Sequence, residues 1–236
     1  TDHMDLDFPE TPDFPANAFQ FDLDEYFGRL NRLKEQYKDK LDLRIGVEIG
    51  LQKHLGEAYH RLTETYPFDF VIGSVHLVGG QDPYYRKIFE GKTDEEVYRM
   101  AFRETLEDVA AVKDFDALGH LDYVVRYGIH QAAEYSYRKF SDEIDAVLKK
   151  LIAEGKGLEM NLAGIKYGLG FPNPHPDVLK RYRELGGEII TIGADAHEPA
   201  HVAYGFEKAA EILRECGFSY YAEFHGRKPV FQRIVP

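Results

Sequence analysis

Five short strings of the chain carry imidazole or carboxylate groups of the kind that bind transition metals. They are Asp2-His3, Gly46-Val47-Glu48-Ile49-Gly50, Gly73-Ser74-Val75-His76, Gly119-His120-Leu121-Asp122 and Gly193-Ala194-Asp195-Ala196-His197. Zinc, manganese and iron accept both ligand types, and one carboxylate can bridge two ions. The glycines suit positions where the backbone turns sharply or approaches a neighbour closely. These types and spacings predict a metal site whose candidate ligands are His3, Glu48, His76, His120, Asp195 and His197.

Each string has a simpler interpretation when it is taken alone. A histidine at a strand end, such as His76 or His120, is more often hydrogen-bonded than metal-bound. Glu48 is harder to explain in this way, because a carboxylate inside an apolar run is costly to bury unless it is paired or bound to a metal. Asp195 and His197 share one face of an extended segment, since side chains alternate along a strand. The five strings together favour the metal site. The other histidines fall in helical or loop segments: His54, His60, His130, His175, His201 and His225. Of these, His175 and His201 lie nearest the five strings and are the two that could contact a bound substrate.

Composition limits the class of protein and of partner. The chain has 236 residues, 44% of them hydrophobic, and a formal net charge of −12. This hydrophobic content is typical of a globular protein and too high for a disordered one. The acidic surplus argues against a nucleic-acid or anionic-membrane surface, since both need a basic footprint. A small phosphorylated substrate stays compatible, because bound metal ions reverse the local field.

The chain also lacks the usual signals of export or membrane insertion. No apolar run approaches the roughly 18–20 residues of a membrane span, and no signal-peptide pattern opens the chain. Cys216 is the single cysteine, so neither an intrachain disulfide nor a thiolate metal cluster can form. A cytoplasmic location is the simplest expectation. The oligomeric state cannot be predicted from these features.

Apolar strand-like runs and amphipathic helical runs alternate along the chain. Helical spacing is expected over residues 23–37, 55–66, 93–109, 142–154, 177–185 and 206–215, and strands over 43–51, 68–78, 117–121, 158–162, 188–192 and 218–222. Thr93 followed by Glu96 is a capping-box signature. Such alternation without a break in composition predicts one α/β domain over 1–236, with a parallel sheet that is closed or nearly closed into a barrel. In barrels the functional groups follow the carboxyl ends of the strands, where the five strings and a further polar string, Glu159-Met160-Asn161, lie.

The five strings, in this order, resemble the polymerase and histidinol phosphatase (PHP) superfamily of metal-dependent phosphoesterases, and more narrowly its histidinol-phosphate phosphatases. The stretch Asn173-Pro174-His175-Pro176, followed by a helix, is similar to that branch. The resemblance implies a distorted TIM-like barrel of seven β/α units that holds up to three divalent ions of zinc, manganese or iron.

Each ligand role is implied by this resemblance. Glu48 would bridge two ions, with His76 and His120 completing one of them. Asp195 would bind the neighbouring ion, and His3 with His197 would bind the third. The family's first motif, a His-x-His on the first strand, has no counterpart in the printed sequence and would precede Thr1, so the first β/α unit is expected to be missing. The Glu48–His76–His120 site is the one that these residues build most completely.

The expected reaction is hydrolysis of L-histidinol phosphate to L-histidinol and phosphate, a step of histidine biosynthesis. A site with two or three ions lowers the pKa of a bridging water and holds the phosphoryl oxygens, so a metal-bridging hydroxide is the expected nucleophile. Asp195 or His197 would transfer protons, including the one that the leaving alkoxide takes. Arg126 and Lys166, in loops at the expected mouth of the barrel, are candidates to bind the phosphate.

Two alternatives remain at this point. One is a PHP phosphoesterase acting on a nucleotide or another small phosphate ester, including a polymerase-associated 3′-exonuclease. The acidic charge and the single domain speak against a nucleic-acid substrate. The other is a catalytically impaired PHP domain kept for structure or for docking a partner, which the missing first motif allows.

Overall fold

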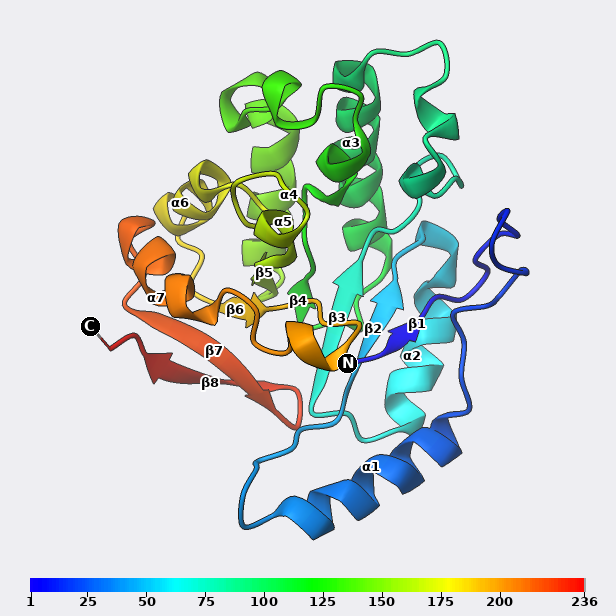
Figure 1. Cartoon of the computed structure of the whole chain (residues 1–236), viewed down its shortest axis with the longest axis vertical. Helices are drawn as coiled ribbons and strands as arrows, with labels where there is room; N and C mark the ends of the chain where they lie inside the picture. The colour runs from blue at the N-terminus through cyan, green and yellow to red at the C-terminus, as the bar shows by residue number, and fades with distance from the viewer. Residues whose placement is uncertain (236) are drawn as a thin grey trace.

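The computed structural model describes residues 1–235, and its centre is a six-stranded sheet in which every neighbouring pair of strands is parallel. The strands lie in chain order: β1 (His3–Met4), β2 (Gly46–Gly50), β3 (Phe70–Ser74), β4 (Ala117–Leu118), β5 (Gly157–Asn161) and β6 (Ile190–Gly193). Parallel neighbours need a crossover of a dozen or more residues, and helices supply most of these connections. The carboxyl ends of all six strands therefore lie at one end of the molecule (Figure 1).

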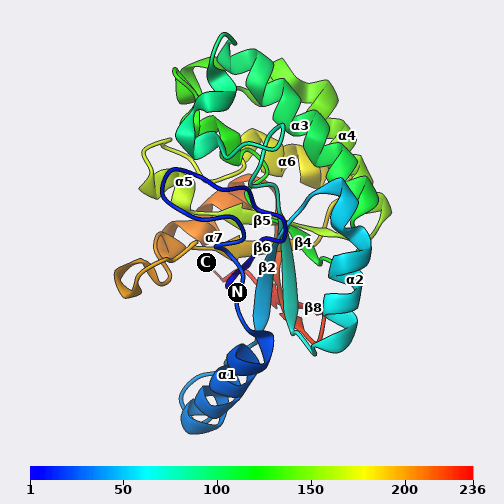
Figure 2. The ribbon, with the colours of Figure 1, turned by 90° about the vertical axis from the view of Figure 1, so that its right-hand side faces the viewer.

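Seven α-helices accompany the strands within the described residues: α1 (Leu23–Tyr37), α2 (Gly56–Thr65), α3 (Asp94–Ala111), α4 (Ser141–Ala153), α5 (Ala163–Lys166), α6 (Pro176–Glu184) and α7 (Phe206–Glu215). Short 3₁₀ turns fill the loops: η1 (Lys53–Leu55), η2 (Pro83–Tyr85), η3 (Lys87–Phe89), η4 (Tyr123–Tyr127), η5 (Gln131–Glu134), η6 (Tyr137–Phe140) and η7 (Pro199–His201). The helices α3 and α4 pack side by side, whereas α1 lies beyond the amino ends of β2 and β3 (Figures 1 and 2). No helix among residues 1–235 is long and apolar enough to span a membrane.

The periodic segments form the predicted helices. The bounds predicted for α1 and α7 agree with the structure, and the capping box is present, because the Thr93 hydroxyl accepts from the Glu96 amide while the Glu96 carboxylate accepts from the Thr93 amide. Fully buried side chains such as Tyr59, Phe102 and Leu148 join the helices to the sheet in one core. Apolar periodicity and capping therefore position these helices as expected.

Several strands, most clearly β2, β3 and β4, are shorter than their apolar runs suggested. Strand β3 ends at Ser74, although Leu77 and Val78 beyond it are buried as well. These residues fill the core from a loop in which Val78 and Gln81 form an isolated antiparallel bridge. Burial extends beyond the hydrogen-bonded ladder because the chain turns over the end of the sheet, and this turn carries His76.

The C-terminal segment departs from the predicted alternation. A strand does follow Phe218, but β7 (Tyr220–His225) pairs antiparallel with β8 (Lys228–Arg233) in a separate two-stranded hairpin. The sequence analysis assigned no element to residues 228–233, which form β8. Gly226 and Arg227, both with positive φ, form a two-residue turn of the kind that hairpins favour. A Gly within a short polar break between two apolar runs was the signal for this turn.

The two edge strands of the parallel sheet curve towards each other. The Nε2 atom of His3, in β1, lies 3.4 Å from the Nε2 atom of His197, four residues after β6. A cavity of about 640 Å³ lies between these edges, lined from both sides by residues such as Thr1 and Ala194. The sheet thus has the curvature of a TIM-like barrel, with β1 and β6 as its unpaired edges among the described residues.

Candidate metal centre

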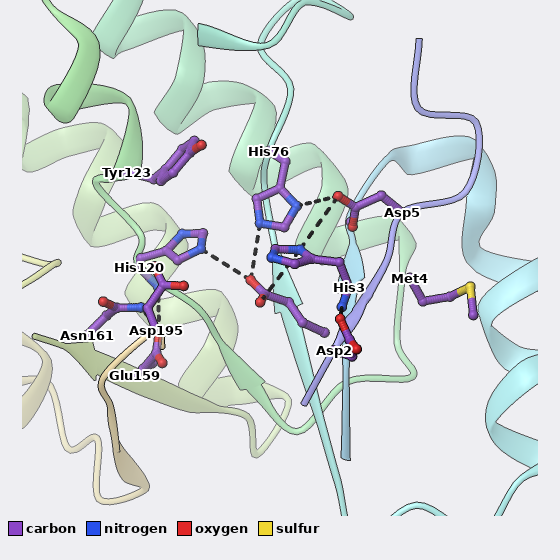
Figure 3. Close-up of polar contacts among 12 residues, drawn as sticks. Asp2, His3, Met4, Asp5, His76, His120, Tyr123, Glu159, Asn161 and Asp195 are labelled. Carbon is purple, nitrogen blue, oxygen red and sulfur yellow. Dashed lines mark hydrogen bonds and ion pairs between the residues drawn. The ribbon is translucent and has the colours of Figure 1, made fainter. Parts of the chain in front are cut away.

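The predicted ligands converge at the carboxyl ends of the strands. His3 and Glu48 are register partners on β1 and β2. His76 and His120 each lie two residues after a strand, β3 and β4 respectively, and Asp195 lies two residues after β6. Figure 3 shows the imidazoles of His3, His76 and His120 gathered around one point, with Asp195 beside them. Strands that end at the same edge bring these distant residues together, as parallel topology requires.

The Glu48 carboxylate is the centre of this cluster. Its Oε1 atom lies 3.1 Å from His76 Nε2 and 3.3 Å from His120 Nε2, and its Oε2 atom lies 3.8 Å from His3 Nδ1. Burial by itself would raise the pKa of Glu48, but the charge of His3 and the hydrogen bonds with His120 and His76 hold it well below its usual range. The carboxylate therefore stays ionised, as a metal ligand must.

Asp5 orients one of the histidines, and the sequence analysis did not identify it as a site residue. His76 donates from Nδ1 to Asp5 Oδ2 over 2.8 Å, which leaves its Nε2 atom facing Glu48. Burial opposes the charged form of His76, but Asp5 and then Glu48 raise its pKa well above the usual value. A carboxylate behind a histidine is the common arrangement around metal-binding imidazoles. Its position two residues after His3, on the same strand face, was the available signal.

Asp195 and His197 form the opposite side of the cluster. The Nδ1 atom of His197 lies 3.4 Å from Asp195 Oδ1, and its Nε2 atom faces the Nε2 atom of His3 at 3.4 Å. Asp195 has a positive φ of 50°, which aims its carboxylate back at the cluster. Positive φ is unusual for a residue other than glycine and is found where function over-determines the backbone.

The chemistry of these groups fits divalent metal ions. Donor atoms of His3, Glu48 and His76 all lie within 4.8 Å of one another. Three buried polar atoms in the same place, His3 Nδ1, Asp5 Oδ1 and His120 Nδ1, have no hydrogen-bond partner among the described residues. Buried polar atoms without partners are rare in folded proteins, and several in one cluster indicate a site built for an ion. The nitrogen and carboxylate donors suit zinc, manganese or iron.

The two predicted phosphate-binding residues lie beside Asp195. The Arg126 guanidinium is buried, with Nη1 3.8 Å from Asp195 Oδ2, and Nη2 donates to Asn173 Oδ1 over 3.0 Å. Its Cζ atom stands 4.6 Å from the centre of the Tyr167 ring. Lys166 donates from Nζ to the Asp195 carbonyl over 3.0 Å, and burial lowers its pKa.

Further polar residues support this arrangement from behind. Glu159 accepts the backbone amide of His120 over 3.0 Å, and burial raises its pKa to about 7. Asp122 is buried and accepts from the side chain of Asn173, the residue that holds Arg126. The sequence places Glu159 at the end of a predicted strand, but these contacts join residues that lie about 40 to 50 positions apart, so no local pattern predicts the contacts themselves.

The two histidines that lay nearest the strings have structural contacts instead. His175 accepts the amide of Asp177 at the start of α6, and its ring packs 4.6 Å from that of Phe171. His201 lies 3.1 Å from Glu198 in η7.

A cavity of about 490 Å³ opens above the cluster. Its wall includes His3, His76, His120, Asp195, His197 and Arg126, together with several aromatic residues and the acidic residues Asp5 and Asp82. This volume suits a small organic ligand. A phosphate ester in the cavity would thus lie between a candidate metal centre and a buried guanidinium.

Comparison with known proteins agrees with this site. A family model described as "PHP domain" matches residues 1–163. A "Probable histidinol-phosphatase" of Clostridium acetobutylicum is 32% identical over 98% of this chain and 83% of its own length. The "Histidinol-phosphatase" of Lactococcus lactis is 31% identical over 91% of this chain and 80% of its own length.

A solved structure shares the whole fold. The crystal structure of the histidinol phosphate phosphatase from Lactococcus lactis, in complex with zinc, L-histidinol and phosphate, superimposes with a TM-score of 0.84. It is 30% identical and covers 98% of this chain and 85% of that chain. The two chains thus share one architecture over nearly all the residues of this protein.

Proposed function

The chain belongs to the PHP domain family, and on this premise we propose that it is a metal-dependent phosphomonoesterase that hydrolyses L-histidinol phosphate to L-histidinol and phosphate. The observation that carries the proposal is the Glu48 carboxylate, within 3.3 Å of two imidazoles, beneath a cavity that Arg126 also lines. The relatives named above, and the zinc, L-histidinol and phosphate in the Lactococcus lactis structure, support the choice of substrate.

Divalent ions held by His3, Glu48, His76, His120, Asp195 and His197 would supply an activated water near neutral pH and positive charge against the phosphoryl oxygens. The protein residues do the remaining work. Asp5 fixes the orientation of the His76 ring, and Glu159 fixes the backbone from which the His120 side chain projects.

Arg126 and Lys166 bind the phosphate group of the substrate. The Arg126 side chain is held between Asn173 and the ring of Tyr167, so little freedom remains to be lost when its planar fork engages two oxygens. Lys166 adds a point charge beside Asp195. Its lowered pKa follows from burial, and an anionic ligand would raise that pKa again.

His197 is the proposed proton donor to the leaving alkoxide, a role that it takes only while its ring is not bound to an ion. Its side chain is 60% exposed, so it can exchange protons with solvent, and Asp195 lies 3.4 Å from its Nδ1 atom. A general acid must be held within reach of the leaving oxygen. Asp195 thus orients the donor as well as contributing to the metal centre.

The surroundings of the reaction follow from the same features. We propose one catalytic domain over 1–236 that acts in the cytoplasm in histidine biosynthesis, on a small substrate and not on nucleic acid. The net charge of −12 supports the exclusion of nucleic acid, because a polyanion needs a basic surface.

The test is phosphate release by the purified protein with Mn²⁺ or Zn²⁺. L-histidinol phosphate should be hydrolysed in preference to nucleoside monophosphates, and His197→Asn should lose most of the activity. His60→Asn, a change of the same type on the exposed side of α2, should keep it. Turnover of nucleotides without turnover of L-histidinol phosphate would point to a different PHP phosphoesterase. Bound metal without turnover of any phosphoester would point to a structural domain.

A further inference from the structure

One wall of the cavity carries an acidic residue that the reaction described above does not use. Asp82, in the loop between β3 and α3, lines the cavity together with Tyr84 and Tyr127. Its Oδ1 atom accepts the amide of Tyr84 over 2.9 Å. Within residues 1–235, no lysine, arginine or histidine lies within ion-pair distance of its carboxylate. The group is only partly exposed, and burial raises its pKa.

The loop holds this carboxylate in a defined place. Asp82 is the N-cap of η2, and the Val78–Gln81 bridge closes the chain just before it with hydrogen bonds of 2.9 and 3.1 Å. Tyr85 ties the loop to the N-terminal region, because its hydroxyl donates to Asp13 over 2.9 Å. The position of Asp82 therefore exists before any ligand binds, as a recognition residue requires.

The rings of Tyr84, Tyr123 and Tyr127 line the same cavity as the acidic group. Tyr84 packs edge-on against Tyr127 with 5.9 Å between ring centres, and Tyr127 packs against Tyr123 at 5.1 Å. Tyr84 is 58% exposed, so one of its faces is open to a ligand. An acid among aromatic rings is a favourable environment for an organic cation.

We propose that Asp82 binds the α-ammonium group of the substrate and that Tyr84 and Tyr127 pack against its imidazole ring. The inference rests on the proposed function. L-histidinol phosphate carries an anionic group at one end and an ammonium group and a planar ring at the other. The cavity offers groups of complementary chemistry, because its lining includes the metal ligands and Arg126 for the phosphate, and Asp82 with the tyrosines for the ammonium group and the ring. Asp82 then selects phosphate esters that carry an ammonium group over phosphate esters that lack one.

The test compares Asp82→Asn with the parent protein on two substrates. One is L-histidinol phosphate, and the other is 3-(imidazol-4-yl)propyl phosphate, which has the same carbon chain and ring but no amino group. Asparagine has nearly the same shape and can still accept the Tyr84 amide, so the loop should keep its conformation. The matched control is Glu90→Gln, the same loss of charge at an exposed position of the same loop. The measured quantities are kcat and KM for each protein and substrate.

Asp82→Asn removes the charge that accepts the hydrogen bond of the substrate ammonium group. The typical strength of a hydrogen bond between charged groups predicts that kcat/KM on L-histidinol phosphate falls roughly ten- to hundredfold. Activity on the amine-free analogue should change less than about threefold, and the Glu90→Gln variant should match the parent on both. Equal losses on the two substrates, or no loss on either, would overturn the ammonium site. If the parent hydrolyses neither compound, the proposed function fails, which is a separate result.

Discussion

Replacing Glu48 by Gln tests the metal centre most directly. Glutamine has the same size as glutamate but is neutral, and its amide presents one weakly coordinating oxygen. The carboxylate that it replaces lies 3.1 Å from His76 Nε2 and 3.3 Å from His120 Nε2, so no other group can take its place between the rings. The variant should fold like the parent and lose the ability to be stabilised by divalent ions.

The expected size of the effect follows from mass action. An ion that binds only the folded state at a free concentration 100 times its Kd adds about 2.7 kcal/mol to the free energy of unfolding. One kcal/mol shifts the melting temperature of a domain of this length by roughly 2–4 °C. Chelation should therefore lower the melting temperature of the parent by about 5–11 °C and that of Glu48→Gln by less than about 2 °C.

The assay is thermal unfolding with Mn²⁺ or Zn²⁺ and again after removal by chelator, followed by circular dichroism. Glu57→Gln is the matched control, because that side chain is 95% exposed on α2. It should show the same chelator effect as the parent. If the parent melts at one temperature with and without chelator, or if Glu48→Gln keeps the full shift, the reasoning about this site is wrong.

Three further predictions concern stability and substrate binding. Burial raises the pKa of Asp108 to about 7, so ionisation of this carboxyl lowers the stability of the parent as pH rises from about 4 to 7. In urea unfolding, Asp108→Asn should therefore be more stable than the parent above pH 7, by on the order of 2–4 kcal/mol. The gain should vanish near pH 4. Arg126→Ala should mainly raise KM, and Asn173→Ala should do the same to a smaller extent, in steady-state phosphate release. Thr93→Ala should lower the free energy of unfolding by about 1 kcal/mol through loss of the α3 cap, with kcat and KM unchanged.

Each of these has a result that would contradict it. A stability gain for Asp108→Asn that is equal at pH 4 and pH 8 would show that ionisation of this carboxyl is not involved. A fall in kcat without a change in KM for Arg126→Ala would mean that Arg126 acts in the transition state and not in phosphate binding. A change in KM for Thr93→Ala would mean that the start of α3 is coupled to the cavity.

The helices and the type of fold could be predicted from the sequence because they depend on local patterns. The apolar faces of residues 23–37 and 206–215 repeat at helical spacing, and the Thr93–Glu96 pair marks a helix start three residues apart. The ends of the strands could not be predicted in this way. Leu77 and Val78 are as buried as strand residues, yet a hydrogen-bonding partner, and not apolarity, decides whether a residue belongs to the ladder.

The ligand types of the site could be predicted, whereas the contacts that organise them could not. Glu48 was conspicuous because a carboxylate inside an apolar run demands an explanation. The roles of Asp5 and Asn173 depend on partners 71 and 47 residues away, and short polar residues in loops are common. Asp82 shows the same limit, since only the folded loop shows that it faces the cavity without a cationic partner.

The electrostatics of the cluster explain why these residues need a positive charge among them. Asp5 and Glu48 lie on either side of the His76 ring and raise its pKa despite burial, whereas the charge of His3 and the hydrogen bonds with His120 and His76 lower the pKa of Glu48. The two carboxylates stabilise a proton on His76, and they also stabilise a divalent ion bound to its Nε2 atom and to Glu48. Because the imidazole must lose that proton before it coordinates, metal binding competes with protonation and releases a proton. The ion brings one more unit of charge than the proton does. The same carboxylates that stabilise the imidazolium therefore favour the metal more strongly, and the net charge next to Arg126 becomes attractive to a phosphate.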